Sequence, residues 1–215
     1  MTRADHVTIQ ILVLAKTPVP GRVKTRLCPP WTLRQAADIA AAALADTITT
    51  VTATPDAVRT LVIDGDLPAP PGWRRMVQRG TTLAERLAHA YADSWMPGLP
   101  SLLIGMDTPH LSVIDLVAAG RALGTSDAVL GLAEDGGWWA LGLQDSGHAA
   151  LLRGIRTSAP DTGTSTLEAL RRHGLAVAML PVMRDVDTAE DAHAVAGLCP
   201  PESLFARAVP QAVTA

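Results

Sequence analysis

Four basic side chains crowd into one early loop, directly after a run that is typical of a buried strand. The stretch from Ala15 to Leu27 reads AKTPVPGRVKTRL and follows the apolar run VTIQILVLA. In an open parallel sheet, ligands bind beyond the carboxyl ends of the strands, and the loop after the first strand often holds phosphates. A glycine lets the backbone approach an anion, and lysine and arginine supply charge to its oxygens. The pattern predicts a phosphate-binding set of Ala15, Lys16, Gly21, Arg22, Lys24 and Arg26.

Composition alone leaves a second interpretation of this loop open, namely a solvated basic turn of the kind common on surfaces. Two named phosphate motifs are excluded by spacing. Lys24-Thr25 lacks a glycine beside the lysine, so the loop is not a Walker A motif, and no G-x-G-x-x-G follows the strand. Neither a P-loop ATPase nor a dinucleotide oxidoreductase is favoured.

Carboxylates follow two later apolar runs. Asp107 ends the run in LLIGMDTPHLS, and Asp187 lies in MRDVDTAEDAH after another run. Carboxylate oxygens and substrate phosphates together complete a Mg²⁺ shell, and two strands can bring one carboxylate each to the same edge. We therefore expect Mg²⁺ (or Mn²⁺) on Asp107 and Asp187, the latter preferred to Asp185. A turn aspartate that only satisfies backbone amides is the alternative for Asp107.

The segment GLAEDGGWWALGL joins two apparent strands through a strong turn signal, Asp135-Gly136-Gly137. Its glycines, which lack side chains, would let a substrate approach the backbone closely, and the ring of Trp138 would form one side of the substrate site. Its acids could accept from a substrate hydroxyl or add carboxylates near the metal. We predict a substrate-binding set of Glu134, Asp135, Gly136, Gly137 and Trp138. A tight hairpin whose tryptophans only pack the core is an equally good interpretation.

The elements that must position these residues alternate between short apolar runs and helical patterns, which predicts a mostly parallel sheet flanked by helices. Strands are expected at 7–15, 60–64, 101–106, 127–132, 138–143 and 175–181. Capping residues predict helices that begin after Thr32, Thr82, Ser112, Ser165 and Thr188. We expect one α/β domain over residues 1–198, and a Pro- and Ala-rich tail over 199–215 that is partly disordered.

Composition narrows the class of protein. A chain of 215 residues with 48% hydrophobic residues fits one domain with a substantial core. A net charge of −3 gives no basic field, which disfavours nucleic acid as a partner. Cys28 and Cys199 lack disulfide or metal-site spacing, and no apolar run looks long enough to span a bilayer. We expect a cytoplasmic protein without a membrane partner; no oligomeric state is predicted.

In their order and spacing, AKTPVPGRVKTRL, GMDTPHLS, AEDGGWWALGL and DVDTAEDA resemble the bacterial DUF2064 family. That family is described as glycosyltransferase-like, or as a radical-SAM- and selenodomain-associated transferase 1. It is similar to nucleotide-diphospho-sugar transferases of the GT-A fold. The resemblance implies a three-layer GT-A-like domain, a nucleotide held by the loop after the first strand, and a metal held by two aspartates. By position it implies Lys24, Asp107 and Asp187 as the catalytic set.

The sequence departs from the family beside the first metal aspartate. The family usually has Ser before and Cys after that residue and a second Asp beyond the proline, where this sequence has Met106, Thr108 and His110. Any mechanism that needs two acids in that loop is therefore in question.

Together these observations predict a Mg²⁺-dependent transferase. Its donor would be a nucleoside triphosphate or a nucleotide-diphospho-sugar, and its acceptor a small molecule. Nucleotidyl and glycosyl transfer both remain open. A nucleotide-binding regulatory module without turnover is the alternative, favoured by His110 and opposed by the retained Lys24, Asp107 and Asp187.

Overall fold

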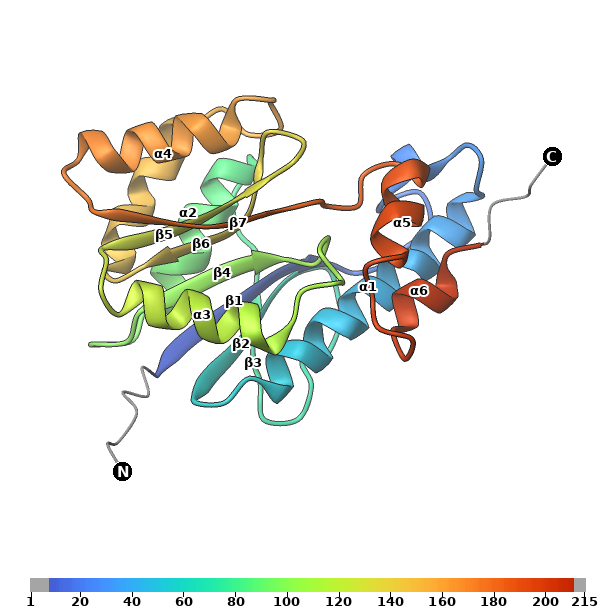
Figure 1. Cartoon of the computed structure of the whole chain (residues 1–215), viewed down its shortest axis with the longest axis horizontal. Helices are drawn as coiled ribbons and strands as arrows, with labels where there is room; N and C mark the ends of the chain where they lie inside the picture. Colours follow the sequence, from blue (N-terminus) through green and yellow to red (C-terminus); the bar gives the residue numbers. More distant parts are fainter. Residues whose placement is uncertain (1–7, 211–215) are drawn as a thin grey trace.

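Seven strands form one sheet in the order β3-β2-β1-β4-β6-β5-β7 (Figure 1). The computed structural model describes residues 8–210. The strands are β1 (Ile9–Lys16), β2 (Ala57–Asp64), β3 (Arg74–Val77), β4 (Ser101–Gly105), β5 (Ala128–Ala133), β6 (Trp138–Leu143) and β7 (Val177–Met183). All pairs are parallel except those of β6, which runs antiparallel to β4 and β5. The predicted mostly parallel sheet is confirmed.

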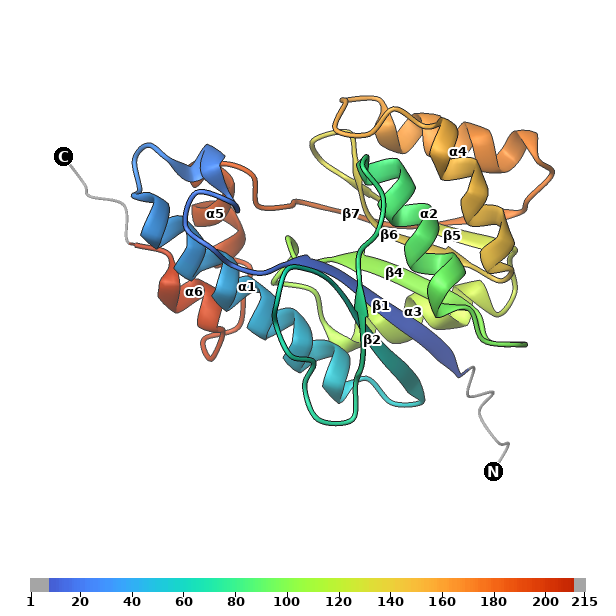
Figure 2. The same ribbon diagram turned by 180° about the vertical axis from the view of Figure 1, so that it is seen from behind.

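Helices cover both faces of this sheet and make three layers (Figures 1 and 2). Helices α1 (Leu33–Ala53) and α3 (Val113–Leu123) pack on one face. Helices α2 (Leu83–Ser94) and α4 (Thr162–Arg172), with the 3-10 helix η2 (Ser146–Gly154), pack on the other. Because β1 is covered on both sides, Ile11 and Val13 enter one core while Leu12 enters the other.

Most helix starts follow from local chemistry. Helices begin after Thr32, Thr82, Ser112 and Thr188, as predicted, and a capping box forms at each of them. The predicted start after Ser165 is wrong, because α4 already begins at Thr162. The short strand β3 and the helix η2 were not predicted either. Three of the four residues of β3 are exposed, so the strand carries no alternating apolar pattern.

The end of the chain builds a small third core at one end of the molecule (Figure 2). Helices α5 (Ala189–Ala196) and α6 (Leu204–Ala208) pack there with the first part of α1 and with the segment that precedes it, burying Leu27, Val186 and Phe205. The segment predicted as a tail thus contains α6, whose Phe205 is fully buried. Residues 211–215 lie outside the described part.

Helix α1 is the one helix among residues 8–210 that is long and apolar enough to cross a membrane by length and composition alone. A core helix passes the same test, and eight residues of α1 are buried, among them Ala40, Leu44 and Val51 in the core against the sheet.

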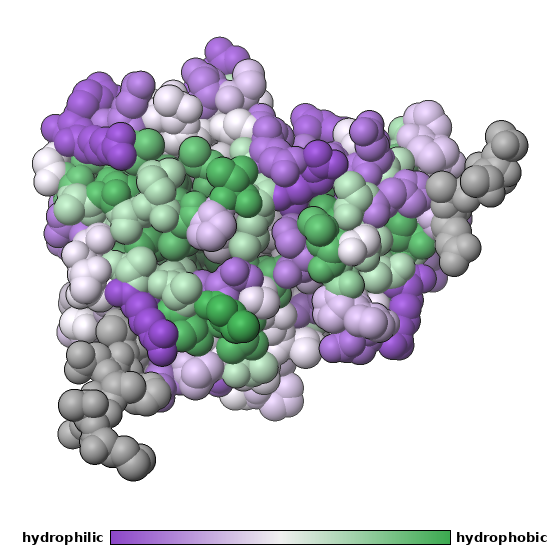
Figure 3. All heavy atoms as spheres, viewed as in Figure 1, coloured by the Kyte–Doolittle hydropathy of each residue, from purple (hydrophilic) through white to green (hydrophobic). Residues whose placement is uncertain are grey.

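Apolar side chains reach the surface on the face that carries β7 and α3 (Figure 3). The exposed ones in and beside these elements include Ile114, Met179 and Val182.

Candidate active site

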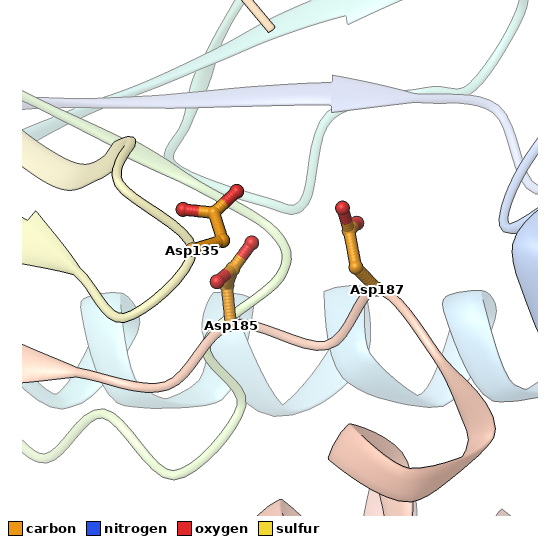
Figure 4. Close-up of side chains that lie close together, drawn as sticks. All are labelled: Asp135, Asp185 and Asp187. Atoms are coloured by element: carbon orange, nitrogen blue, oxygen red, sulfur yellow. The ribbon is translucent and has the colours of Figure 1, made fainter. Parts of the chain in front are cut away.

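Acidic side chains from two separate segments meet beyond the ends of the strands. Asp135 lies in the turn between β5 and β6, and Asp185 and Asp187 follow β7 (Figure 4). One carboxylate oxygen from each of the three lies within 4.8 Å of the others. Asp185 and Asp187 flank Val186, whose side chain is buried, so the two-residue spacing directs both acids away from the core.

The group carries excess negative charge. Burial, and then the nearby Asp135 and Asp187 carboxylates, raise the pKa of Asp185 to about 6. Carboxylate oxygens are the hard donors that Mg²⁺ and Mn²⁺ prefer, and three of them lie close together here. The residues present therefore fit a divalent cation, and Asp187, one of the two predicted ligands, is among them.

Lys24 brings the other predicted ligand to this group. Its Nζ lies 2.7 Å from Asp107 Oδ1 and 3.6 Å from Asp187 Oδ1, and it donates a hydrogen bond to the Val186 carbonyl. Burial alone would lower the pKa of Lys24, but the carboxylates of Asp107, Asp187 and Asp185 outweigh it and leave the pKa above its usual value. The three residues of the predicted catalytic set are thus brought together.

Backbone contacts fix this meeting point. The Val186 amide donates to the Asp107 carbonyl at 2.9 Å, which ties the loop after β4 to the segment after β7. Lys24 itself has a left-handed backbone, with φ 47°, and its neighbours Val23 and Leu27 are buried. Arg26, from the same loop, pairs with Asp187 Oδ2 at 2.8 Å. The basic loop and the acids therefore form one site.

Two of the remaining residues of the predicted phosphate loop line an open pocket of about 440 Å³. Lys16 and Arg22 line it with Thr17, Val19 and residues 64–66. The buried Thr17 hydroxyl has no hydrogen-bond partner within residues 8–210. Gly21 has a left-handed backbone, with φ +78°. Ala15 is buried, and its carbonyl accepts a hydrogen bond from the Gln78 side-chain amide. Another hollow of about 350 Å³, between α2 and η2, is lined by none of the predicted site residues.

The residues of the predicted substrate-binding turn lie in different environments. Asp135 faces the acidic group and accepts from the Gly137 amide at 2.7 Å, whereas Glu134 pairs with Arg184 at 2.6 Å. Gly136 is required by packing, since a Cβ there would lie 1.9 Å from the Pro160 carbonyl oxygen. Trp138 is half-buried against the core on the sheet face covered by α2 and α4, so a role for it as a substrate wall stays a prediction.

Sequence reasoning undervalued Asp185, missed the Val186 carbonyl and did not foresee the surroundings of His110. The i, i+2 spacing around an apolar residue was the available signal for Asp185. The Val186 carbonyl carries no sequence signal, because every residue has one. The third feature is His110, which replaces a family acid. Its Nδ1 is buried without a hydrogen-bond partner in the described chain. Burial lowers the pKa of His110, although the negative charges of Asp115 and Glu134 act to raise it.

Comparison with solved structures places the fold in a known class. A "putative nucleotide-diphospho-sugar transferase" from Desulfovibrio desulfuricans G20 matches with a TM-score of 0.83 and 29% identity, covering 93% of each chain. A 4-diphosphocytidyl-2C-methyl-D-erythritol synthase matches with a TM-score of 0.56 and 15% identity, covering 89% of this chain and 97% of the other. Rv0371C of Mycobacterium tuberculosis H37Rv in complex with manganese matches with a TM-score of 0.53 and 17% identity, covering 87% of this chain and 97% of the other. The predicted GT-A-like α/β fold is confirmed.

The chain belongs to the family described as "Uncharacterized protein conserved in bacteria (DUF2064)", whose model matches residues 35–159. The resemblance read from the sequence motifs is thereby confirmed. A search of the curated proteins finds no match.

Proposed function

We propose that this protein is a divalent-metal-dependent transferase with a nucleoside triphosphate or nucleotide-diphospho-sugar donor and a small-molecule acceptor. One observation carries the proposal: Lys24 and the carboxylates of Asp107, Asp135, Asp185 and Asp187 converge at the strand ends. The names of the similar structures, a sugar-nucleotide transferase and a cytidylyl synthase, support the same reaction type. A bound Mg²⁺ or Mn²⁺ would neutralise the donor phosphates and orient them for displacement.

The residues take separate parts in this proposal. Asp107 and Asp187 are the metal ligands expected from the sequence, and Asp135 and Asp185, whose carboxylates lie beside Asp187, are proposed as further ligands. Lys24 and Arg26 would neutralise charge that develops on the transferring phosphoryl group. Lys16 and Arg22 line the open pocket, which we assign to the rest of the donor nucleotide. The free thiols of Cys28 and Cys199 are compatible with the cytoplasm as the proposed setting.

The geometry favours nucleotidyl transfer over glycosyl transfer. An acceptor phosphate is already an anion and needs no protein base, whereas an acceptor hydroxyl does. Two of the three candidate bases are engaged: Glu134 pairs with Arg184, and Asp135 belongs to the acidic group. The third, His110, has a buried Nδ1 without a partner in the described chain, and it is the base that glycosyl transfer would have to use. Glycosyl transfer is the second candidate, because the structural match at 29% identity is named a nucleotide-diphospho-sugar transferase.

Calorimetry with a panel of nucleoside triphosphates and diphospho-sugars, each with and without Mg²⁺, tests the proposal. We expect Mg²⁺-dependent binding of one triphosphate, weakened on the order of a hundredfold in Asp107→Ala because a metal ligand is lost. Preference for a diphospho-sugar would move the conclusion to glycosyl transfer. Binding without turnover of any acceptor would leave a regulatory module, and no binding at all would exclude every one of these functions.

A further inference from the structure

Lys24 occupies the carboxylates that the proposed metal needs. Its ammonium has three N–H donors and three oxygen neighbours, from Asp107, Asp187 and the Val186 carbonyl. The side chain is only 10% exposed. The lysine expected to hold phosphate therefore has its three N–H donors directed at the proposed metal ligands and at the Val186 carbonyl.

The same two carboxylates cannot serve both cations well. An ammonium 2.7 Å from Asp107 Oδ1 would lie close to a divalent ion bound to that residue, and like charges at such distances repel strongly in a partly buried site. Arg26 differs in this respect. It reaches the other oxygen of Asp187 from the solvent side, with 72% of its side chain exposed, so water screens its charge.

The surrounding structure allows Lys24 to leave without a rearrangement of the loop. Val23 and Leu27 anchor the backbone in the core on either side of it. The four-carbon stem of a lysine can turn about its own bonds and carry the charge several ångströms. The open pocket lined by Lys16 and Arg22 belongs to the same loop, so nucleotide phosphates bound there would offer new oxygen partners.

We propose that Lys24 is a built-in counterion that keeps Asp107 and Asp187 occupied until metal and nucleotide arrive together. This inference rests on the proposed function. The metal takes the carboxylates from Lys24, and the phosphates take Lys24 from the carboxylates. Each ligand thereby removes the obstacle to the other, and the coupling must be reciprocal. Metal alone and nucleotide alone bind weakly, whereas the pair binds tightly.

The unmodified protein offers an internal control for a test by amine labelling, because Lys16 and Lys24 are its two lysines. Lys16 is exposed and reports the unhindered rate. We expect acetylation of Lys24, followed by mass spectrometry, to be at least tenfold slower than that of Lys16 without ligands. Saturating Mn²⁺ alone should accelerate labelling of Lys24 and leave Lys16 unchanged. Slow labelling of Lys24 with Mn²⁺ bound would overturn the inference.

A pair of variants gives a second readout that does not depend on activity. Without nucleotide, Lys24→Met should bind Mn²⁺ at least tenfold more tightly than the unmodified protein. The control Arg34→Met, which removes an exposed positive charge on α1 outside the site, should stay within twofold. The expectation for nucleotide binding is opposite, with a large loss in Lys24→Met. Equal Mn²⁺ affinity in Lys24→Met and the unmodified protein would overturn the inference. If Lys24→Met does not fold, the labelling result decides.

The failure of the inference differs from the failure of the proposed function. An unmodified protein that binds Mn²⁺ and nucleotide normally, with Lys24 indifferent to Mn²⁺, contradicts only the counterion role. A protein that binds neither Mn²⁺ nor any nucleotide contradicts the proposed function, and the counterion role with it.

Discussion

The pKa of the single residue Asp185 reflects the negative charge of the whole site. Its carboxyl group is partly buried beside Asp135 and Asp187, and its pKa rises to about 6 from an ordinary value of 3.8. A carboxyl group whose pKa is raised on folding stabilises the fold below the unfolded pKa, and this contribution is lost as the pH rises through the folded value. The metal-free protein should therefore lose stability between about pH 4 and 6 through this group.

Asp185→Asn tests this account by removing the charge and keeping the shape. Without divalent metal at pH 7 to 8, the variant should be the more stable by about 1 kcal/mol, allowing for solvent screening, or ~2–4 °C in melting temperature. The advantage should vanish near pH 4, where both side chains are neutral, and should reverse in saturating Mn²⁺. Thermal unfolding across a pH series measures all three.

Asp66→Asn is the control for this series, because it removes a fully exposed carboxylate. Its melting temperature should follow that of the unmodified protein to within about 1 °C. An Asp185→Asn variant that is less stable than the unmodified protein at pH 7 without metal would contradict the charge-repulsion account.

Lys24, Asp107 and Asp187 were predictable as a group because each follows or precedes an element whose pattern is plain in the sequence. The rule that ligands gather beyond the carboxyl ends of parallel strands then brings them together. The sequence does not predict which groups surround Asp185 and Glu134. A shift of one residue in an extended segment reverses the direction in which a side chain points. The sequence does not show where the extended segment begins.

At the scale of elements, the turn between β5 and β6 is held against the start of α4. The Gly163 amide donates to the Gly136 carbonyl at 2.8 Å, and Gly136 has φ +90°. This packing fixes the position of Asp135 next to the segment after β7. The sequence predicted the turn but not its contact with α4, which joins residues far apart in the chain.

Gly136→Ala should therefore cost more than backbone strain alone. Its Cβ would lie 1.9 Å from the Pro160 carbonyl oxygen, whereas Gly72, at φ +80°, has nothing within 4 Å of its Cβ position. We expect Gly72→Ala to lower the free energy of unfolding by about 1 kcal/mol through strain, and Gly136→Ala by roughly 2–4 kcal/mol through strain and overpacking. Chemical denaturation measures both.

The same pair of variants connects the turn to the site. Gly136→Ala should also weaken Mn²⁺ binding, since the turn that carries Asp135 must move, and Gly72→Ala should leave binding unchanged. Equal losses of stability in the two variants would show that the close contact with Pro160 is not maintained in solution.

Elements with strong local signals were predicted, and those fixed by distant contacts were not. Four capping boxes formed where serine or threonine precedes Gln, Asp or Glu by three residues. Ser165 offers the same spacing to Glu168, but the helix begins earlier, at Thr162. The Gly163 amide is satisfied there by Gly136, a partner that local sequence cannot reveal. A cap signal inside a longer helix is therefore misleading.

At the scale of the molecule, the site lies where the sheet meets the small core made by α1, α5 and α6 (Figure 1). Lys24 and Asp187 lie on segments that enter this core through Leu27 and Val186. The position of the two charged groups therefore depends on how firmly the end of the chain is packed. We accordingly propose that the domain extends through α6 rather than ending near residue 198.

Asp46 on α1 makes the decisive contact for this proposal. Its carboxylate accepts hydrogen bonds from Ser203 Oγ at 2.6 Å, from the Leu204 amide at 3.0 Å and from the Phe205 amide at 2.9 Å. Asp46→Ala would remove a charged acceptor from the first turn of α6, which should cost about 2–3 kcal/mol. Asp38→Ala, on the same helix, breaks only an exposed pair with Arg34 and should cost at most about 0.5 kcal/mol.

Hydrogen exchange with and without Mn²⁺ decides between a tail and a part of the domain. If α6 belongs to the domain, Asp46→Ala should speed exchange over residues 186–210 and weaken Mn²⁺ binding, because Asp187 loses its support, whereas Asp38→Ala should change neither. Faster exchange confined to residues 203–210, with Mn²⁺ affinity intact, would instead show that α6 is an appendage and that the site is held by the sheet and α5 alone.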